Sequence, residues 1–489
     1  MALIDVSHLS FAYDGSYDYI FEDVSFQIDT DWKLGFIGRN GKGKTTFLRL
    51  LLGRYEFQGS ISAPVEFEYF PFPVEDSSLD TLDILEGVCR DAPEWKLRQE
   101  LAALEVNEEI LYRPFDTLSN GERTKALLAA LFLRENHFLL IDEPTNHLDQ
   151  KGRELVSQYL SRKKGYILVS HDRAFLDRCV DHILSINRSD IELQRGNFST
   201  WWENKARKDH FERAENEKLK KEIKRLGETA REKANWSDRI ESTKIGQGSA
   251  DRGWIGHRSA KMMKRAKAIE GRRQAALNDK AKLLKNVESI QALKISQQDY
   301  HTDRLLALRD VTVDYGSGPV CSPVTFTAAQ GDRIALVGRN GSGKSSILKL
   351  IHGEDIPYSG TLERGGQLKI SYVPQDASDL TGSLTDYARA YEIDESLFKA
   401  ILRKLDFDRA QFEKDMAAFS AGQKKKVLIA RSLCEQAHIH IWDEPMNYID
   451  VFSRMQIEEL LIRFRPTILF VEHDKAFCDA VATKTIPLS

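Results

Sequence analysis

The sequence predicts an α/β protein built from two homologous domains, with a long helical segment between them. The runs 38–41, 142–144 and 171–172 return in the same order at 338–341, 443–445 and 473–474. In each copy an apolar strand leads into a glycine-rich loop and then into a helix. A repeat that keeps its order and spacing indicates two copies of one domain.

Composition favours a globular protein that acts away from the membrane. The chain has 489 residues, of which 42% are hydrophobic, and this is enough for several buried cores. No apolar run approaches the roughly 18 residues that would span a bilayer, and the first residues lack the pattern of a signal peptide. The five cysteines are scattered, and an odd number does not suit a disulfide framework. We therefore expect a cytoplasmic protein.

The segment between the two copies differs from them in charge. From Lys205 to Val287 it holds 24 Lys and Arg but 12 Asp and Glu, a net charge of +12, whereas the rest of the chain carries −16. Apolar residues recur at helical spacing in 219–230 and in 262–287, and a glycine-rich run lies between these stretches. We expect domains at 1–204 and 301–489. A coiled-coil-like helical hairpin would occupy 205–300, with its tip near 244–257.

Such a hairpin has two interpretations. It could be a solvated spacer that only separates the domains, as runs of charge usually are. Its excess of positive charge and its glycine-rich tip favour a basic probe that contacts nucleic acid.

Each copy contains a phosphate-binding loop of the pattern G-x-x-x-x-G-K-[ST], between a strand and a helix. Its backbone N–H groups face the phosphates at a helix N-terminus. The lysine reaches the outer phosphates, and the hydroxyl of Thr45 or Ser345 ligates Mg²⁺. The nucleotide-binding candidates are Gly38, Asn40, Gly41, Gly43, Lys44, Thr45 and Thr46 in the first copy, and Gly338, Asn340, Gly341, Gly343, Lys344, Ser345 and Ser346 in the second.

Two acidic residues end an apolar strand in each copy, Asp142 with Glu143 and Asp443 with Glu444. Alone, such acids would be solvated loop residues. Downstream of a phosphate-binding loop, the aspartate suits Mg²⁺ and the glutamate can orient or deprotonate the attacking water.

A serine and a glycine open a helix between these two motifs. The residues are Ser119, Gly121 and Glu122 in the first copy, and Ser420, Gly422 and Gln423 in the second. Alone, this pattern would be an ordinary helix N-cap. The hydroxyl, the free N–H groups and the positive helix end also make an anion site.

The order of these motifs along both copies resembles that of ABC-type ATPases, with the Ser-Gly motif as their signature. The run 142–149, with sequence DEPTNHLD, and the charged segment between tandem cassettes resemble the ABC-F branch. Within that branch, the segments 9–14, 32–46 and 251–265 resemble the Lsa-type antibiotic-resistance proteins, which protect ribosomes.

The resemblance implies a monomer whose two P-loop cassettes close head to tail around two ATP molecules with Mg²⁺. Each site would join the P-loop of one cassette to the signature of the other. The resemblance also assigns a γ-phosphate contact to His171 and His473, and Mg²⁺ ligation to Gln375. Tyr13 and Tyr315 occupy the positions that stack on adenine. These histidines could instead be ordinary loop residues, and the tyrosines could be core residues at strand ends.

The chain departs from the family pattern at one position in the first cassette. Phe72 stands where the family has the glutamine that Gln375 supplies in the second cassette. Phenylalanine can neither ligate Mg²⁺ nor hydrogen-bond water. We therefore expect the two sites to hydrolyse ATP differently.

For function, the resemblance implies an ATPase that docks on the 70S ribosome. Its hairpin would reach 23S rRNA and the P-site tRNA, and would displace lincosamides, streptogramin A compounds and pleuromutilins. One alternative is a housekeeping ABC-F translation factor that acts on stalled ribosomes. Another is the detached ATPase of a membrane transporter, in which the basic hairpin would have no obvious role.

Overall fold

The computed structural model describes residues 2–14, 19–90, 92–146, 148–187, 190–212, 214–218, 221, 293–295, 297–316 and 318–488. The chain divides into two compact units, Met1–Trp201 with Ile290–Ser489, and Trp202–Ser289. A helix runs from 198 to 212 and so crosses this division. The expected hairpin tip at 244–257 lies outside the described residues, and the domain boundaries at 204 and 300 remain predictions.

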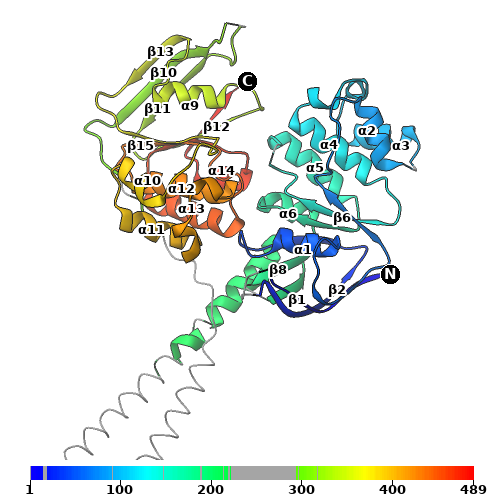
Figure 1. The fold of residues 1–489 in the computed structure, drawn as a ribbon. Helices are drawn as coiled ribbons and strands as arrows, with labels where there is room; N and C mark the ends of the chain where they lie inside the picture. The colour runs from blue at the N-terminus through cyan, green and yellow to red at the C-terminus, as the bar shows by residue number, and fades with distance from the viewer. Residues whose placement is uncertain are drawn as a thin grey trace, which may run out of the picture. The chain divides into compact units, whose positions relative to one another are not determined.

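The first cassette contains a six-stranded sheet and a three-stranded sheet (Figure 1). Its strands are β1 (Leu3–Phe11), β2 (Phe21–Asp29), β3 (Lys33–Ile37), β4 (Gln58–Ser62), β5 (Glu66–Phe70), β6 (His137–Asp142), β7 (Tyr166–Val169), β8 (His182–Asn187) and β9 (Asp190–Arg195). Its helices are α1 (Lys44–Leu51), α2 (Thr81–Cys89), α3 (Glu94–Ala103), α4 (Asn120–Leu131), α5 (Gln150–Ser161) and α6 (Arg173–Cys179), with the 3-10 helices η1 (Glu108–Tyr112) and η2 (Phe115–Thr117).

The second cassette repeats this plan. Its strands are β10 (Arg304–Val313), β11 (Val324–Ala329), β12 (Arg333–Gly338), β13 (Tyr358–Arg364), β14 (Ile370–Val373), β15 (Ile439–Asp443), β16 (Ile468–Val471) and β17 (Lys484–Leu488). Its helices are α9 (Lys344–His352), α10 (Leu384–Ala390), α11 (Glu395–Lys404), α12 (Ala421–Cys434), α13 (Val451–Phe464) and α14 (Lys475–Val481), with η3 (Arg409–Glu413) and η4 (Met416–Ala418). The structure thus confirms the predicted α/β class and the tandem cassettes.

Strand order explains why motifs far apart in sequence meet. The main sheets run β5-β6-β7-β3-β8-β9 and β14-β15-β16-β12-β17, and all neighbouring strands are parallel except β8 with β9. The strand before the P-loop therefore lies two places from the strand that ends in the acidic pair. Because the carboxyl ends of parallel strands share one edge, P-loop, acidic pair and histidine loop converge there.

Each P-loop helix is held by buried apolar residues. In the first cassette Phe47 and Leu48 of α1 are fully buried with residues of both sheets, and Ile347 and Leu348 of α9 take these places in the second. Truncating such a phenylalanine to alanine typically costs about 3–5 kcal/mol. The core thus fixes the helix whose N-terminus faces the expected phosphates.

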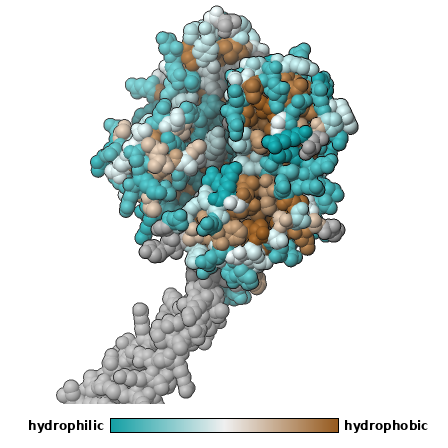
Figure 2. All heavy atoms as spheres, turned by 45° about the vertical axis from the view of Figure 1, so that its right-hand side comes forward, coloured by the Kyte–Doolittle hydropathy of each residue, from teal (hydrophilic) through white to brown (hydrophobic). Residues whose placement is uncertain are grey.

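The described surface carries both polar and apolar side chains. The face in Figure 2 is largely hydrophilic, with separate hydrophobic areas. In the part of the chain that the structure describes, no helix combines the length and apolar character needed to cross a membrane.

Candidate nucleotide-binding sites

The two P-loops have the same local geometry. Gly43 and Gly343 precede α1 and α9 with φ angles of 97° and 79°, a backbone conformation that favours glycine. The Lys44 ammonium donates to the carbonyl oxygen of Gly38 at 2.6 Å, and the Lys344 ammonium donates to that of Gly338 at 3.0 Å. Burial lowers the pKa of both lysines. Each loop therefore holds its lysine at the N-terminus of the following helix, as a phosphate site requires.

Oxygen atoms suited to a metal lie beside each P-loop. In the first cassette Asp142 Oδ2 accepts hydrogen bonds from Thr45 at 3.2 Å and from Tyr69 at 2.8 Å. Asp443 is fully buried, and the Ser345 side chain lies within hydrogen-bonding reach of its carboxylate. Burial raises the pKa of Asp443 to about 6. A buried carboxylate beside a serine hydroxyl fits Mg²⁺, which prefers oxygen ligands.

The two glutamates share a backbone conformation but differ in environment. Glu143 and Glu444 have positive φ angles of 51° and 45°. The Oε1 atom of Glu143 lies 3.3 Å from Nε2 of His171, and the Oε1 atom of Glu444 lies 3.3 Å from Nε2 of His473. Glu444 also accepts a hydrogen bond from Asn447 at 2.6 Å.

The pKa values of these glutamates move in opposite directions. Burial and the charge of Asp142 raise the pKa of Glu143 to about 8. Burial acts to raise the pKa of Glu444 as well. The hydrogen bond and charge of His473, the hydrogen bond from Gln375 and the charge of Lys425 outweigh burial and leave that pKa lowered. The first cassette has Phe72 in place of such a glutamine, so it lacks one of the groups that lower the pKa of Glu444.

Each signature begins a helix with a capping box. Ser119 accepts from the Glu122 amide at 3.3 Å, and the Glu122 carboxylate accepts from the Ser119 amide at 2.8 Å. Ser420 and Gln423 make the same reciprocal bonds. The N-cap interpretation therefore describes the local structure of both motifs.

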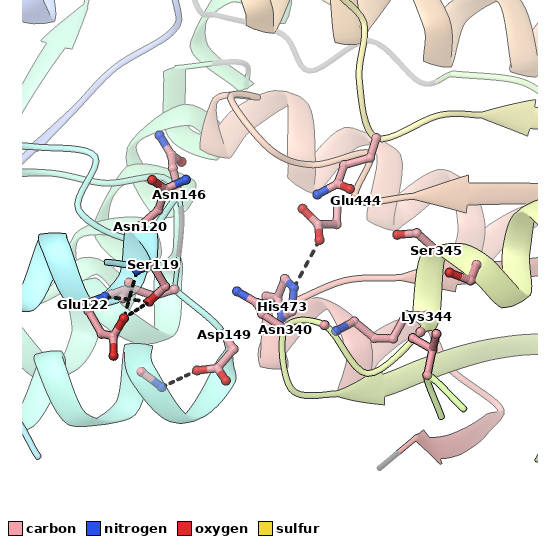
Figure 3. Close-up of a pocket in the computed structure, with 18 of the residues that line it drawn as sticks. Ser119, Asn120, Glu122, Asn146, Asp149, Asn340, Lys344, Ser345, Glu444 and His473 are labelled. Carbon is pink, nitrogen blue, oxygen red and sulfur yellow. Dashed lines mark hydrogen bonds and ion pairs between the residues drawn. The ribbon is translucent and has the colours of Figure 1, made fainter. Parts of the chain in front are cut away.

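A pocket of roughly 670 Å³ joins the second P-loop to the first signature. Figure 3 shows Ser119 and Glu122 on one side, with Lys344, Ser345 and His473 facing them. Of the site residues predicted from the sequence, those that line this pocket are Ser119, Gly121, Glu122, Asn340, Gly341, Gly343, Lys344, Ser345, Ser346, Gln375, Glu444 and His473. This is the combination that the head-to-tail arrangement implies.

The first P-loop meets the second cassette at the corresponding place. Asn40 donates a side-chain hydrogen bond to the Tyr448 carbonyl at 2.8 Å, and a Cβ added to Gly422 would lie 3.1 Å from the Asn40 side-chain nitrogen. Arg39 pairs with Asp406 at 3.7 Å. The Lys44 loop is therefore in contact with the second signature.

Both expected adenine-stacking tyrosines lie at the surface beside their P-loops. Tyr13 and Tyr315 are 42% and 55% exposed, which argues against the core interpretation. The Tyr13 hydroxyl lies 2.8 Å from that of Thr46, and the Tyr315 hydroxyl donates to Ser346 at 3.0 Å. The rings are thus held at the P-loop helices with solvent access.

Sequence reasoning missed several lining residues. Lys125, Asn146 and Asp149 of the first cassette also line the pocket. Asn146 and Asp149 belong to the run that indicated the family branch, so their position after the acidic pair was the available signal. Lys125 lies on α4 beyond the signature and gave no signal of its own.

Comparison with known proteins matches both halves of the chain. A family model described as "ABC transporter" matches residues 21–146 and 321–447. The "Ribosome protection protein VmlR" of Bacillus subtilis (strain 168) is 29% identical over 96% of this chain and 84% of its own length. The "ATP-binding protein Uup" of Caulobacter vibrioides (strain ATCC 19089 / CIP 103742 / CB 15) is 26% identical over 96% of this chain and 74% of its own length.

Solved structures show the same fold at lower identity. The chain called "RNase-L Inhibitor" superposes with a TM-score of 0.63 at 19% identity, over 98% of this chain and 87% of its own. The archaeal ribosome recycling factor aABCE1, in complex with the ribosomal stalk protein aP1, also gives a TM-score of 0.63, at 20% identity and the same coverage. These likenesses support the tandem-cassette fold.

Proposed function

The chain belongs to the ABC transporter family, as an ATPase of its ABC-F branch, and we propose that it acts in the cytoplasm as a ribosome protection factor. ATP binding would close the cassettes and favour docking on the 70S ribosome. Hydrolysis would then permit release.

The basic segment between the cassettes carries this proposal. Its net charge of +12 lies between cassettes that are acidic together, which suits a partner with a phosphate backbone. The similarity to a protein named as a ribosome protection protein extends over nearly the whole chain. Both observations favour ribosomal RNA over a membrane partner.

ATP would bind in each site between a P-loop and the opposite signature. In the second site the Lys344 ammonium would leave the P-loop carbonyls for the outer phosphates, while N–H groups at the start of α4 face the γ-phosphate. Ser345, Gln375 and Asp443 would hold Mg²⁺, which neutralises charge on the phosphates when bound.

Hydrolysis would depend on the glutamate at the end of each acidic strand. Glu444 lies 3.3 Å from His473 and accepts from Asn447, so its carboxylate is oriented toward the pocket to position a water molecule. Glu143 and His171 would play these parts in the first site, with weaker support because Phe72 replaces the glutamine.

On the ribosome, the hairpin would reach 23S rRNA and the P-site tRNA near the peptidyl-transferase centre. Following the Lsa-type resemblance, we propose that it protects against lincosamides, streptogramin A compounds and pleuromutilins. The hairpin would act there while ATP holds the cassettes closed.

Expression in a drug-sensitive bacterium tests the proposal. We expect the native chain to raise the inhibitory concentrations of a lincosamide and a pleuromutilin, but not that of a drug acting on the small ribosomal subunit. Glu143→Gln with Glu444→Gln should abolish protection and trap the protein on 70S particles in sedimentation.

Two outcomes would contradict parts of this function. Trapping without any drug protection would favour the housekeeping translation factor. Recovery of the protein with membranes and not with ribosomes would contradict both ribosomal functions.

A further inference from the structure

The repeat allows the surroundings of the two glutamates to be compared position by position. Aligning the signatures pairs Thr124 with Lys425, and aligning the histidine loops pairs Ser170 with Glu472. All four side chains are buried, at 7%, 2%, 1% and 5% exposure respectively. The second cassette therefore buries a cation and a carboxylate where the first buries two hydroxyl groups.

The Lys425 ammonium joins two loops of the second site. It donates to the carbonyl oxygens of Pro374 at 3.0 Å, Glu444 at 3.1 Å and Asp443 at 3.4 Å. Pro374 directly precedes Gln375, so the lysine links the backbone of this loop to the end of β15. An ammonium group has three donors, and all three are used.

The Glu472 carboxylate makes the complementary connection. Its Oε1 accepts from the Met446 amide at 2.7 Å, and its Oε2 accepts from the His473 amide at 3.1 Å. It therefore links the segment after Glu444 to the residue that contacts Glu444. In the first cassette, the shorter Ser170 hydroxyl lies 3.3 Å from that of Thr145, the counterpart of Met446.

Burying two charged side chains is energetically unfavourable compared with stabilising the fold by uncharged residues. Burying an ion costs several kcal/mol unless its partners replace water well, and uncharged residues of similar size often do as well or better. The first cassette shows that hydroxyl groups suffice to build this region. Glu143 reaches the same left-handed backbone as Glu444 without either charge, so that conformation does not require them.

We propose that Lys425 and Glu472 are positioning residues of the second ATP site. Lys425 holds the Gln375 loop against the strand end that carries Glu444, and Glu472 holds His473 to the other side of Glu444. Together, Lys425 and Glu472 keep the side chains of Gln375, Glu444 and His473 aligned on the ATP. The pair belongs to the cassette that has the glutamine and is missing from the cassette that has Phe72.

ATP turnover of single and combined variants tests this role, in the native chain and in a Glu143→Gln chain that reports the second site. Lys425→Thr and Glu472→Ser each introduce the residue of the first cassette. We expect kcat to fall roughly ten- to hundred-fold, because small displacements of reacting groups lower rates by such factors. The KM for ATP should change less than about two-fold. Lys424→Thr is the matched control, because Lys424 lies on the same helix and its exposed ammonium bonds only the Ser378 carbonyl among the contacts described for it.

The combined variant Lys425→Thr, Met446→Thr and Glu472→Ser separates positioning from stability. It installs the arrangement that folds in the first cassette, so its melting temperature should return to near the native value while kcat stays low. If kcat recovers together with the melting temperature, the pair only stabilises the fold and the proposal is overturned. The same conclusion follows if the loss of kcat in each variant parallels its loss of melting temperature. A rise in KM with unchanged kcat would also overturn it.

Discussion

The side-chain amide of Asn40 donates a hydrogen bond to the backbone carbonyl of Tyr448, 2.8 Å away in the other cassette. Tyr448 has a φ angle of 64°, so its backbone is in the left-handed region. The same carbonyl oxygen lies 2.4 Å from where a Cβ on Gly422 would be. A P-loop residue and a signature glycine of opposite cassettes therefore meet at one backbone oxygen.

Gly422→Ala should weaken this junction. The added methyl group would contact the Tyr448 carbonyl at less than van der Waals distance, and forced contacts of this kind cost about 1–3 kcal/mol. We expect ATP affinity at the Lys44 site to fall roughly ten-fold, as measured by titration with a fluorescent ATP analogue. Gly366→Ala is the control, because a Cβ there meets nothing within 4 Å. Equal effects of both changes would contradict the steric explanation.

Replacing the glutamates one at a time should show unequal losses. Glu444 is oriented by Asn447 and His473. Glu143 has a pKa raised to about 8, and its cassette has Phe72 in place of the glutamine. Loss of a catalytic base typically lowers the rate about 10²- to 10⁴-fold. We expect Glu444→Gln to remove more of the steady-state ATPase activity than Glu143→Gln. The double variant gives the residual rate, and equal losses from the single changes would refute the asymmetry.

Asp450→Asn should destabilise the second cassette. Asp450 is fully buried and accepts from the buried Lys426 at 2.8 Å, so the change leaves that cation uncompensated, which typically costs about 3–5 kcal/mol. Asp149→Asn is the matched control. Asp149 is half-buried and caps α5 as Asp450 caps α13, and asparagine caps nearly as well.

The effect of Asp450→Asn should also depend on pH in a defined direction. Burial acts to raise the pKa of Asp450, but the charge and hydrogen bond of Lys426 outweigh it and hold that pKa well below its usual value. The stabilisation is therefore present above the unfolded pKa of about 3.9 and is lost as pH falls toward the lowered folded value. Thermal unfolding should show a constant difference from pH 8 to about 5 that narrows at more acid pH. A difference that shrinks toward pH 8 would contradict the assignment.

Replacing residues 246–255 with a short Gly-Ser link should separate hydrolysis from protection. This run lies far in sequence from every nucleotide motif, so ATPase activity and melting temperature should be unchanged. Trp254 is the residue in this run that could stack on a base, for which about 1–3 kcal/mol is typical, although it could instead only pack the two helices together.

In a cell-free translation assay, we expect the shortened protein to lose its protection against a lincosamide. Ribosome binding should only weaken and should remain sensitive to salt, because the variant keeps Lys261, Lys264, Arg265 and Lys267, which we propose contact RNA phosphates. Retained protection would make the tip a passive connector.

The local motifs were readable from the sequence because each depends on residues a few positions apart. Gly43 and Lys44 define a loop whose backbone only glycine adopts easily, and Ser119 with Glu122 forms a capping box within one helical turn. The repeat then indicated two copies of the same α/β domain. The departure at Phe72 was visible for the same reason, since it is a single position within a known order of motifs.

Only the tertiary structure decided how those motifs combine. Lys425 is one of three consecutive lysines at 424–426, and only the packing of α12 brings its ammonium to the carbonyl oxygens of Pro374, Asp443 and Glu444. The direction of the pKa shift at Glu143 and at Glu444 likewise follows from burial and from donors on other loops. Strand order and helix packing determine which distant segments share one desolvated space, and the donors and charges that meet there set the direction of each pKa shift.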